Sequence, residues 1–329
     1  MATTIASRKP YSFTHNTTDL TISITAWLTE ITGTTTTYDI IKTSYNELIA
    51  QDLTVNLSPF AGDLYNHVPH VKPTTIVAPA IGGSVELLIT GNITSPEYYT
   101  GYDGWERYLP SVLGISTSST DRNITVDTVQ YISAKLNAID NILWTTEEDT
   151  LEINNPYLSL DKNSIFPVLP SGLTVNNPGT LKIEGRGIGN VVLWTLNYTF
   201  VCPYDEVYTI GFINRYGVWE FVDMVGNVKK NVSTDRKTYI RYDEGLSKNF
   251  NVNGYKSYEV NTGWVDEAFE EVVTDIMLSE HVILYNGTDD SYTKLIVEES
   301  DKVIQNQRTN KMINYQFKFK EAGSIIKIV

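Results

Sequence analysis

Few residues in this 329-residue sequence have the types and spacing that catalysis or metal binding requires. His67 and His70 have a spacing seen in metal sites, but Pro69 opposes the helix that would align two ligands. The single cysteine, Cys202, excludes an intrachain disulfide and a cysteine-based zinc site. The glycine-rich segment 185–190 lacks both the dinucleotide fingerprint and the Lys-Ser/Thr pair of a phosphate loop. We therefore predict no catalytic residues, no metal and no cofactor.

One aromatic segment could support carbohydrate chemistry. Asp103 and Glu106 flank Trp105, and a glycosidase needs two carboxylates that face each other across a sugar cleft. Trp105, Tyr102 and Tyr108 could equally stack on sugars in a binding module without catalysis. Large amphipathic rings also anchor contacts between proteins. We interpret Tyr102, Trp105 and Tyr108 as interface residues, and we predict that the protein is not an enzyme.

Composition indicates a mainly β protein with an acidic character. Hydrophobic residues make up 41% and charged residues 19% of the chain, and the formal net charge is −14 at pH 7. Abundant Thr, Ser, Asn and Tyr favour strands over helices, and the charge opposes binding of the whole chain to nucleic acid or anionic membranes. A local basic strip could face DNA inside a ring, or it is a solvated loop of mixed charge; it contains Lys229, Lys230, Arg236, Lys237 and Arg241.

Neither a targeting segment nor a membrane segment is visible in the sequence. Residues 1–10 lack the apolar core of a signal peptide. No run of about 18 apolar residues occurs, which is the length that a membrane-spanning helix needs. The lone Cys202 fits folding in a reducing compartment. We expect a soluble protein that is made inside a cell.

The N-terminal part reads as a series of strands. Residues 20–28 alternate apolar and hydroxyl side chains with period two, which predicts a strand whose inward face holds Leu20, Ile22, Ile24, Ala26 and Leu28. Further strands are expected at 34–41, 53–57 and 84–90, and their number and spacing favour an Ig-like β-sandwich. The segment 125–139 has apolar residues mostly three or four apart, and it can be a short helix or a strand.

The C-terminal part contains the clearest helix signal. Acidic residues follow the turn at Asn261-Thr262-Gly263, where the helix dipole favours negative charge. One apolar face is expected to hold Phe269, Val272, Val273, Ile276, Met277 and Leu278. We predict that this face and Trp264 form the core of the C-terminal domain, together with a strand whose inward residues are Ile313, Tyr315, Phe317 and Phe319. Shorter strands are expected at 239–242, 248–252 and 255–261.

These patterns predict tandem Ig-like β-sandwich domains followed by a small C-terminal α+β domain. Turn-rich residues between 151 and 178 favour a linker into the second sheet. The expected units are an N-terminal β-sandwich (1–110), a linker or bridging region (111–178), a central β domain (179–235) and a C-terminal α+β domain (236–329).

A hairpin with an unusual tip is predicted at 207–222. Its strands are joined by Asn214-Arg215-Tyr216-Gly217, where Asn and Gly can adopt the positive φ of a tight turn. A turn does not require Arg215 and Tyr216 together, since any polar pair would serve. We therefore expect Asn214, Arg215 and Tyr216 to dock on a neighbouring domain or subunit, or else to be buried locally against their own sheet.

Four segments in one order carry a resemblance to a known group of proteins. They are Gly-Phe-Ile-Asn-Arg-Tyr-Gly-Val-Trp-Glu, Val-Asn-Thr-Gly-Trp-Val-Asp-Glu, Met-Leu-Ser-Glu and Lys-Met-Ile-Asn-Tyr-Gln-Phe-Lys-Phe. Asn-Arg-Tyr-Gly alone would be a good hairpin turn in any β protein. In this order the region 207–319 resembles virion structural proteins of tailed phages that infect Bacteroidetes, crAss-like phages included.

The resemblance implies a virion tail, collar or ring component that self-assembles and joins neighbouring tail proteins. It implies a cyclic homo-oligomer of six or twelve copies and contacts with other tail and portal-vertex proteins, with production in the host cytoplasm. Nucleic acid would be met at most as DNA that passes through a channel. The alternative is a host-surface or glycan-binding adhesin, a receptor-binding tail protein, and behind it a glycan hydrolase.

Overall fold

Strands make up most of the chain in the computed structural model. The structure describes residues 3–6, 10–29, 35–60, 80–81, 84–93, 97–102, 121–126, 129–135, 139–155, 163–175, 179–203, 206–215, 219–240, 242, 247–286, 291–298 and 313–323. Their strands form four sheets. Within these ranges, no helix is long and apolar enough to cross a membrane. The prediction of a mainly β protein is confirmed.

The N-terminal sheet has five strands in the order β1-β6-β5-β2-β3. They are β1 (Thr3–Ala6), β2 (Ser12–Thr29), β3 (Thr35–Asn56), β5 (Ser84–Gly91) and β6 (Glu97–Tyr102). Leu20, Ile22 and Ile24 are fully buried, as their period-two pattern predicts. β3 continues through residues 42–52, where the sequence separates two expected strands, because β2 pairs with it along nearly its whole length.

The middle of the chain forms a second five-stranded sheet and a small three-stranded one, in the orders β10-β9-β12-β13-β7 and β4-β11-β8. The strands are β4 (Ala80–Ile81), β7 (Asp121–Ile124), β8 (Tyr131–Lys135), β9 (Asn141–Thr146), β10 (Thr150–Asn154), β11 (Asn163–Pro167), β12 (Thr180–Gly187) and β13 (Val191–Phe200). Trp144, Leu196 and Tyr198 are buried in their core. The ambiguous segment 125–139 therefore contains a strand, β8.

A seven-stranded sheet and one helix form the C-terminal part, in the order β15-β14-β18-β19-β20-β17-β16. The strands are β14 (Tyr208–Ile213), β15 (Trp219–Met224), β16 (Val228–Ile240), β17 (Ser247–Asn261), β18 (Val282–Asn286), β19 (Ser291–Val297) and β20 (Gln316–Glu321). The 3-10 turn η2 (Glu267–Phe269) leads into α2 (Glu270–Leu278). Val272, Val273 and Ile276 are fully buried and share one apolar cluster with Phe212 and Phe317. The predicted hairpin and helix are confirmed.

Two residues that were assigned to this core lie at the surface instead. Leu278 is 72% exposed. It lies two residues beyond Ile276, a rotation of about 200° around the helix, so it points away from the buried face. Trp264 is 55% exposed. Its neighbour Val265 is buried and bridges to Ile313, and successive residues of an extended segment point in opposite directions. Trp264 is therefore a surface residue and not part of the core.

The sheets also cross two of the expected domain boundaries. β9 and β10 lie in the region expected to be a linker, yet β9 pairs directly with β12 of the central unit. The seven-stranded sheet extends from Tyr208 to Glu321, and the expected boundary at 235/236 falls inside β16. Local turn signals mark where the chain bends, but hydrogen bonds between distant strands decide which segments belong together.

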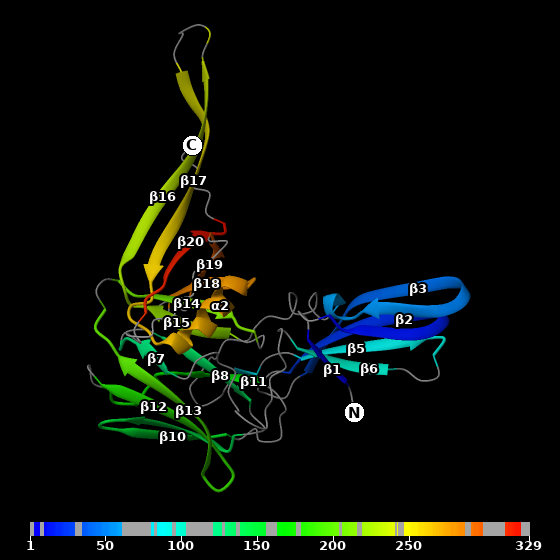
Figure 1. The fold of residues 1–329 in the computed structure, drawn as a ribbon, viewed down its shortest axis with the longest axis horizontal. Helices are drawn as coiled ribbons and strands as arrows, with labels where there is room; N and C mark the ends of the chain where they lie inside the picture. The colour runs from blue at the N-terminus through cyan, green and yellow to red at the C-terminus, as the bar shows by residue number, and fades with distance from the viewer. Residues whose placement is uncertain are drawn as a thin grey trace.

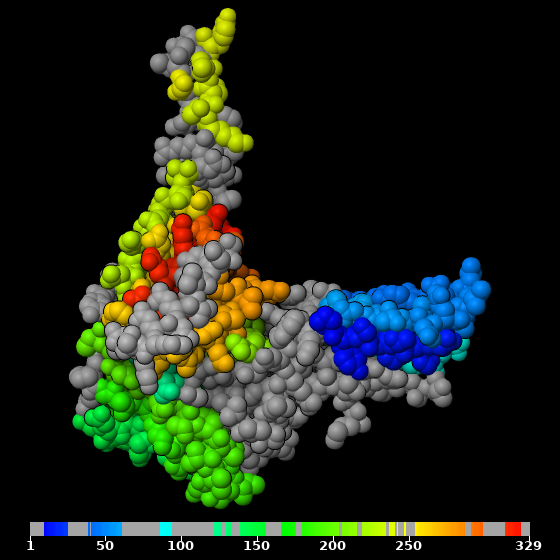
Figure 2. Space-filling model, viewed as in Figure 1, coloured from blue at the N-terminus to red at the C-terminus, as the bar shows by residue number. Residues whose placement is uncertain are grey.

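Two long hairpins extend from the body in different directions (Figure 1). β2 and β3 run the length of the N-terminal sheet, while β16 and β17 project beyond the C-terminal sheet. Only residues 257–261 of β17 also pair with β20, so the rest of this hairpin is a two-stranded ribbon. The space-filling view shows the ribbon as a narrow projection (Figure 2). The short strands expected at 239–242, 248–252 and 255–261 are thus parts of one long hairpin. Its pairing continues through Asn253 and Gly254, where the sequence shows no apolar side chain.

Candidate functional site

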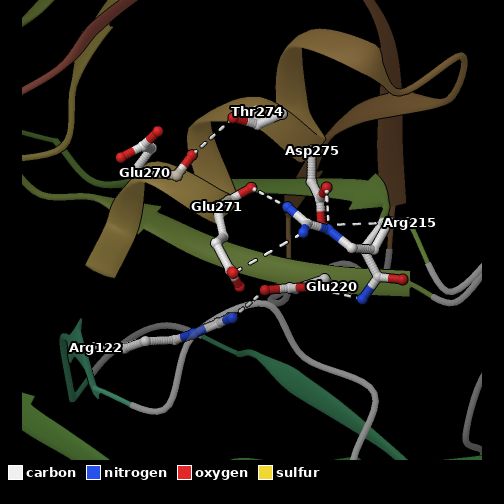
Figure 3. Close-up of polar contacts among 8 residues, drawn as sticks. Arg122, Arg215, Glu220, Glu270, Glu271, Thr274 and Asp275 are labelled. Carbon is white, nitrogen blue, oxygen red and sulfur yellow. Dashed lines mark hydrogen bonds and ion pairs between the residues drawn. The ribbon is translucent and has the colours of Figure 1, made fainter. Parts of the chain in front are cut away.

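A buried polar junction joins two sheets through Arg122 and Glu220, close to the end of β14 (Figure 3). Asn214 follows β14 and is 1% exposed, and its Nδ2 donates to Oε2 of Glu220 at 2.7 Å. Glu220 lies on β15 with its side chain 1% exposed. Its other oxygen, Oε1, accepts from Nη2 of Arg122 on β7. The ion pair therefore joins the second five-stranded sheet to the seven-stranded sheet.

Arg122 is held by β15 through two separate contacts. Besides the ion pair with Glu220, its Nη1 donates to the backbone oxygen of Phe221 at 3.2 Å. Burial by itself lowers the pKa of Arg122, but the charge and hydrogen bond of Glu220, together with the charges of Tyr198 and Asp275, outweigh burial and raise the pKa above its ordinary value. Arg122 and Glu220 are 98 residues apart in sequence. A charged pair this deeply buried is costly to break, so the junction fixes how the two sheets are placed.

A second buried carboxylate strengthens the same junction. Oδ1 of Asp223, also on β15, accepts from the hydroxyl of Thr209 at 2.8 Å, and Oδ2 accepts from the backbone N of Thr125 at 3.2 Å. Thr125 directly follows β7, so this carboxylate also spans the two sheets. Tyr131 of β8 also contacts the seven-stranded sheet, because its ring makes edge contacts with Phe221 and Tyr285.

Arg215 engages the helix of its own sheet. Its Nε donates to Oδ1 of Asp275 at 2.9 Å, and its Nη2 donates to the backbone oxygen of Glu271 at 3.4 Å (Figure 3). Asp275 is charged, yet it is buried together with apolar residues of α2, and its side chain is only 3% exposed. These contacts of Arg215 lie within its own unit and are made with α2. Asn214 instead supports the junction between sheets through Glu220.

The remaining predicted site residues are not placed by the structure. Trp105, Tyr108 and Tyr216 lie outside the described residues, as do Asp103 and Glu106. Tyr102 is the last residue of β6, and its side chain also lies outside the described part. The structure therefore describes only Asn214 and Arg215 among the predicted interface side chains, and the prediction for the aromatic segment stays a prediction.

Sequence reasoning missed the charged residues that form the junction. Glu220 and Asp223 are separated by two apolar residues on β15, and all three residues 221–223 are buried. A carboxylate within an otherwise buried strand is a usable signal, because burial of a charge requires a partner. Asp275 carries the same signal on the helix. Arg122 has no such signal, since its surroundings in sequence are polar.

The comparisons with known proteins identify no family for this chain. It matches no family model, and no curated protein matches it. Within the described ranges, no three His, Cys, Asp or Glu side chains are grouped so that they could hold a metal ion. His67 and His70 are outside these ranges.

Proposed function

We propose that this chain is a structural component of a tailed-phage virion, a tail, collar or ring protein that self-assembles and joins neighbouring tail proteins. The resemblance of region 207–319 to virion proteins supports the proposal. In this proposal the sheets act as tandem Ig-like sandwich modules with a small C-terminal α+β module. Six or twelve copies form a closed ring that other tail and portal-vertex proteins contact.

The β16–β17 ribbon is the observation that supports this function best. Beyond residues 257–261 of β17 the two strands pair with each other and with no other described strand. A two-stranded ribbon is only marginally stable in water, because it has no sheet face of its own to bury. Val232 and Ile240 are nevertheless 64% and 71% exposed on it. Such a ribbon is suited to being covered by another protein in an assembly.

The buried junction supports the same function from inside the chain. A subunit of a particle must present its contact surfaces at fixed relative positions, so that the assembly closes. The Arg122–Glu220 pair and the hydrogen bond from the backbone N of Thr125 to Asp223 hold β7 against β15. Any other placement of the two sheets would leave these buried polar groups without hydrogen-bond partners, which costs free energy. In this proposal the junction fixes the relative position of the two sheets, and it needs no catalytic group.

The test is to locate the protein in purified particles of a tailed phage that encodes it. Quantitative mass spectrometry of the particles should find the chain at a fixed ratio to the portal protein. Deleting its gene should give particles with incomplete tails, and supplying the chain from a plasmid should restore them. A chain absent from washed particles would refute the structural function. Binding of the purified chain to host glycans, measured on a glycan array, would instead favour the adhesin.

A further inference from the structure

Two of the longest strands, β3 and β16, lie at the outer edges of their sheets. Each ends the strand order of its sheet, and among the described strands β3 pairs with β2 alone and β16 with β17 alone. β3 has 22 residues and β16 has 13. At roughly 3.3 Å per residue, β16 presents about 40 Å of backbone edge. Exposed edges of this length readily pair with another chain unless something covers or blocks them.

Both edges carry large apolar side chains in water. On β3, Leu48 and Ile49 are 101% and 78% exposed. They lie in the four-residue bulge between Asn46 and Gln51, where the register with β2 shifts. On the ribbon, Val232 and Ile240 are exposed to a similar degree. Charges and bulges alone could protect an edge from pairing, but protection does not explain why aliphatic side chains are placed there.

The two edges have opposite charge. β3 has three acidic residues and one basic residue, Asp39, Glu47, Asp52 and Lys42. β16 has four basic residues and one acidic residue, Lys229, Lys230, Arg236, Lys237 and Asp235. Glu47 and Lys237 are both exposed. Like edges of two molecules would repel one another, while β3 and β16 would attract.

We infer that β16 of one copy of this chain pairs along the outer edge of β3 of a second copy, so that a continuous sheet links the two molecules. The inference rests on the proposed function and deepens it, because it names the surfaces through which the copies assemble. Backbone hydrogen bonds supply affinity, and the exposed aliphatic side chains together with the opposite charges select this pair of edges. Pairing two different surfaces is head-to-tail, and repeated head-to-tail contacts generate a ring when the rotation closes.

Nucleic acid is the other occupant that a basic strand could attract. Phosphate contacts need positive charge, but they do not need Val232 and Ile240 on the same ribbon. Two of the four basic residues are also partly neutralised within the chain. Nζ of Lys230 is 2.6 Å from Glu206, and Nζ of Lys229 is 3.7 Å from Glu259. The combination of edge, aliphatic residues and moderate charge therefore fits a second copy better than DNA.

Cross-linking of mixed variants tests which edges meet. Two full-length chains are prepared, both with Cys202→Ser, one carrying Ala50→Cys on β3 and the other Thr238→Cys on β16. A short bismaleimide should give cross-linked dimers in the mixture and not in either chain alone. A mixture of Thr238→Cys with Thr199→Cys on β13, an exposed control position, should give none. Dimers in a single-variant sample, or none in the first mixture, would overturn the inference.

Sedimentation velocity of the full-length chain measures the strength of the same contact. Ile240→Ser or Ile49→Ser should weaken self-association by about tenfold, whereas Val191→Ser, at a 61% exposed position on β13, should not change it. Lys237→Glu should weaken association, and adding Glu47→Lys should restore it. An invariant monomer, or a Lys237→Glu variant that loses binding to duplex DNA while self-association is unchanged, would overturn the inference.

The outcomes separate this inference from the proposed function. If the chain is found in purified particles but the mixture does not cross-link, the β3–β16 contact is wrong and the virion function remains. If the mixture cross-links but the chain is absent from particles, the contact is right and the virion function is wrong.

Discussion

The Arg122–Glu220 pair offers the sharpest test of how the two sheets are held together. We consider the variant Arg122→Met, which keeps a long unbranched apolar stem but removes the charge and all the donors of the guanidinium. The side chains of Arg122 and Glu220 are 3% and 1% exposed, so water cannot replace the lost guanidinium. Glu220 would retain the hydrogen bond from Asn214 at 2.7 Å and no ion pair with Arg122. Removing one partner of a buried ion pair costs about 3–5 kcal/mol, and we expect this loss in the free energy of unfolding.

The assay is equilibrium unfolding in urea, followed by tryptophan fluorescence and by far-ultraviolet circular dichroism. Two probes are needed because a chain of several sheets need not unfold in one step. The matched control is Lys229→Met, which removes the exposed ion pair between Lys229 and Glu259. Lys229 is 70% exposed with its Nζ 3.7 Å from Glu259, and pairs of this kind contribute at most about 1 kcal/mol.

A double variant separates loss of packing from loss of charge compensation. Arg122→Met together with Glu220→Gln removes the uncompensated charge and keeps an oxygen that can accept from Asn214. It should therefore be more stable than Arg122→Met alone by about 1–4 kcal/mol. If Arg122→Met unfolds within about 1 kcal/mol of the unaltered chain, the pair does not hold the sheets together, and the reasoning is refuted.

Three further expectations concern the helix face, a close backbone approach and alkaline stability. Ile276→Ala should lower the free energy of unfolding by about 2–5 kcal/mol because Ile276 is fully buried, while Leu278→Ala should change it by less than about 0.5 kcal/mol. Equal effects in urea unfolding would contradict the assigned face. Gly211→Ala should destabilise by about 1–3 kcal/mol in the same assay, because the added Cβ would lie 2.8 Å from Cε1 of Phe221; an unchanged midpoint would refute this contact. Burial raises the pKa of Tyr198 to about 12 from 10.0, so its contribution to stability is complete below pH 10 and is lost as the pH rises toward about 12. Tyr198→Phe should lack this part of the alkaline loss in unfolding curves, and an identical pH profile would contradict it.

Local patterns in the sequence were sufficient where one face of an element is buried. The alternation at Leu20, Ile22 and Ile24 predicts the inward face of β2, and the spacing of Val272, Val273 and Ile276 predicts the face of α2. In both cases the periodicity of the backbone brings apolar side chains to one side, and burial of that side stabilises the element. Such a signal needs no knowledge of the partner.

The same approach failed where strands are paired but exposed. Most described residues of the β16–β17 ribbon face water, so no period-two pattern marks how far the two strands extend. The uninterrupted course of β3 through residues 42–52 has the same cause. These strands are held by backbone hydrogen bonds to a neighbour, and backbone groups are nearly identical for every residue type.

The mainly β fold could be predicted from the sequence, because strand propensity and apolar periodicity are local properties. The hairpin formed by β14 and β15 could be predicted in the same way. Three features became visible only in the folded chain: Glu220 contacts Arg122, Arg215 contacts Asp275, and Trp264 lies at the surface. The physical reason is that a buried charge requires a partner but does not specify which one, and a partner 98 residues away becomes a neighbour only when the sheets have packed.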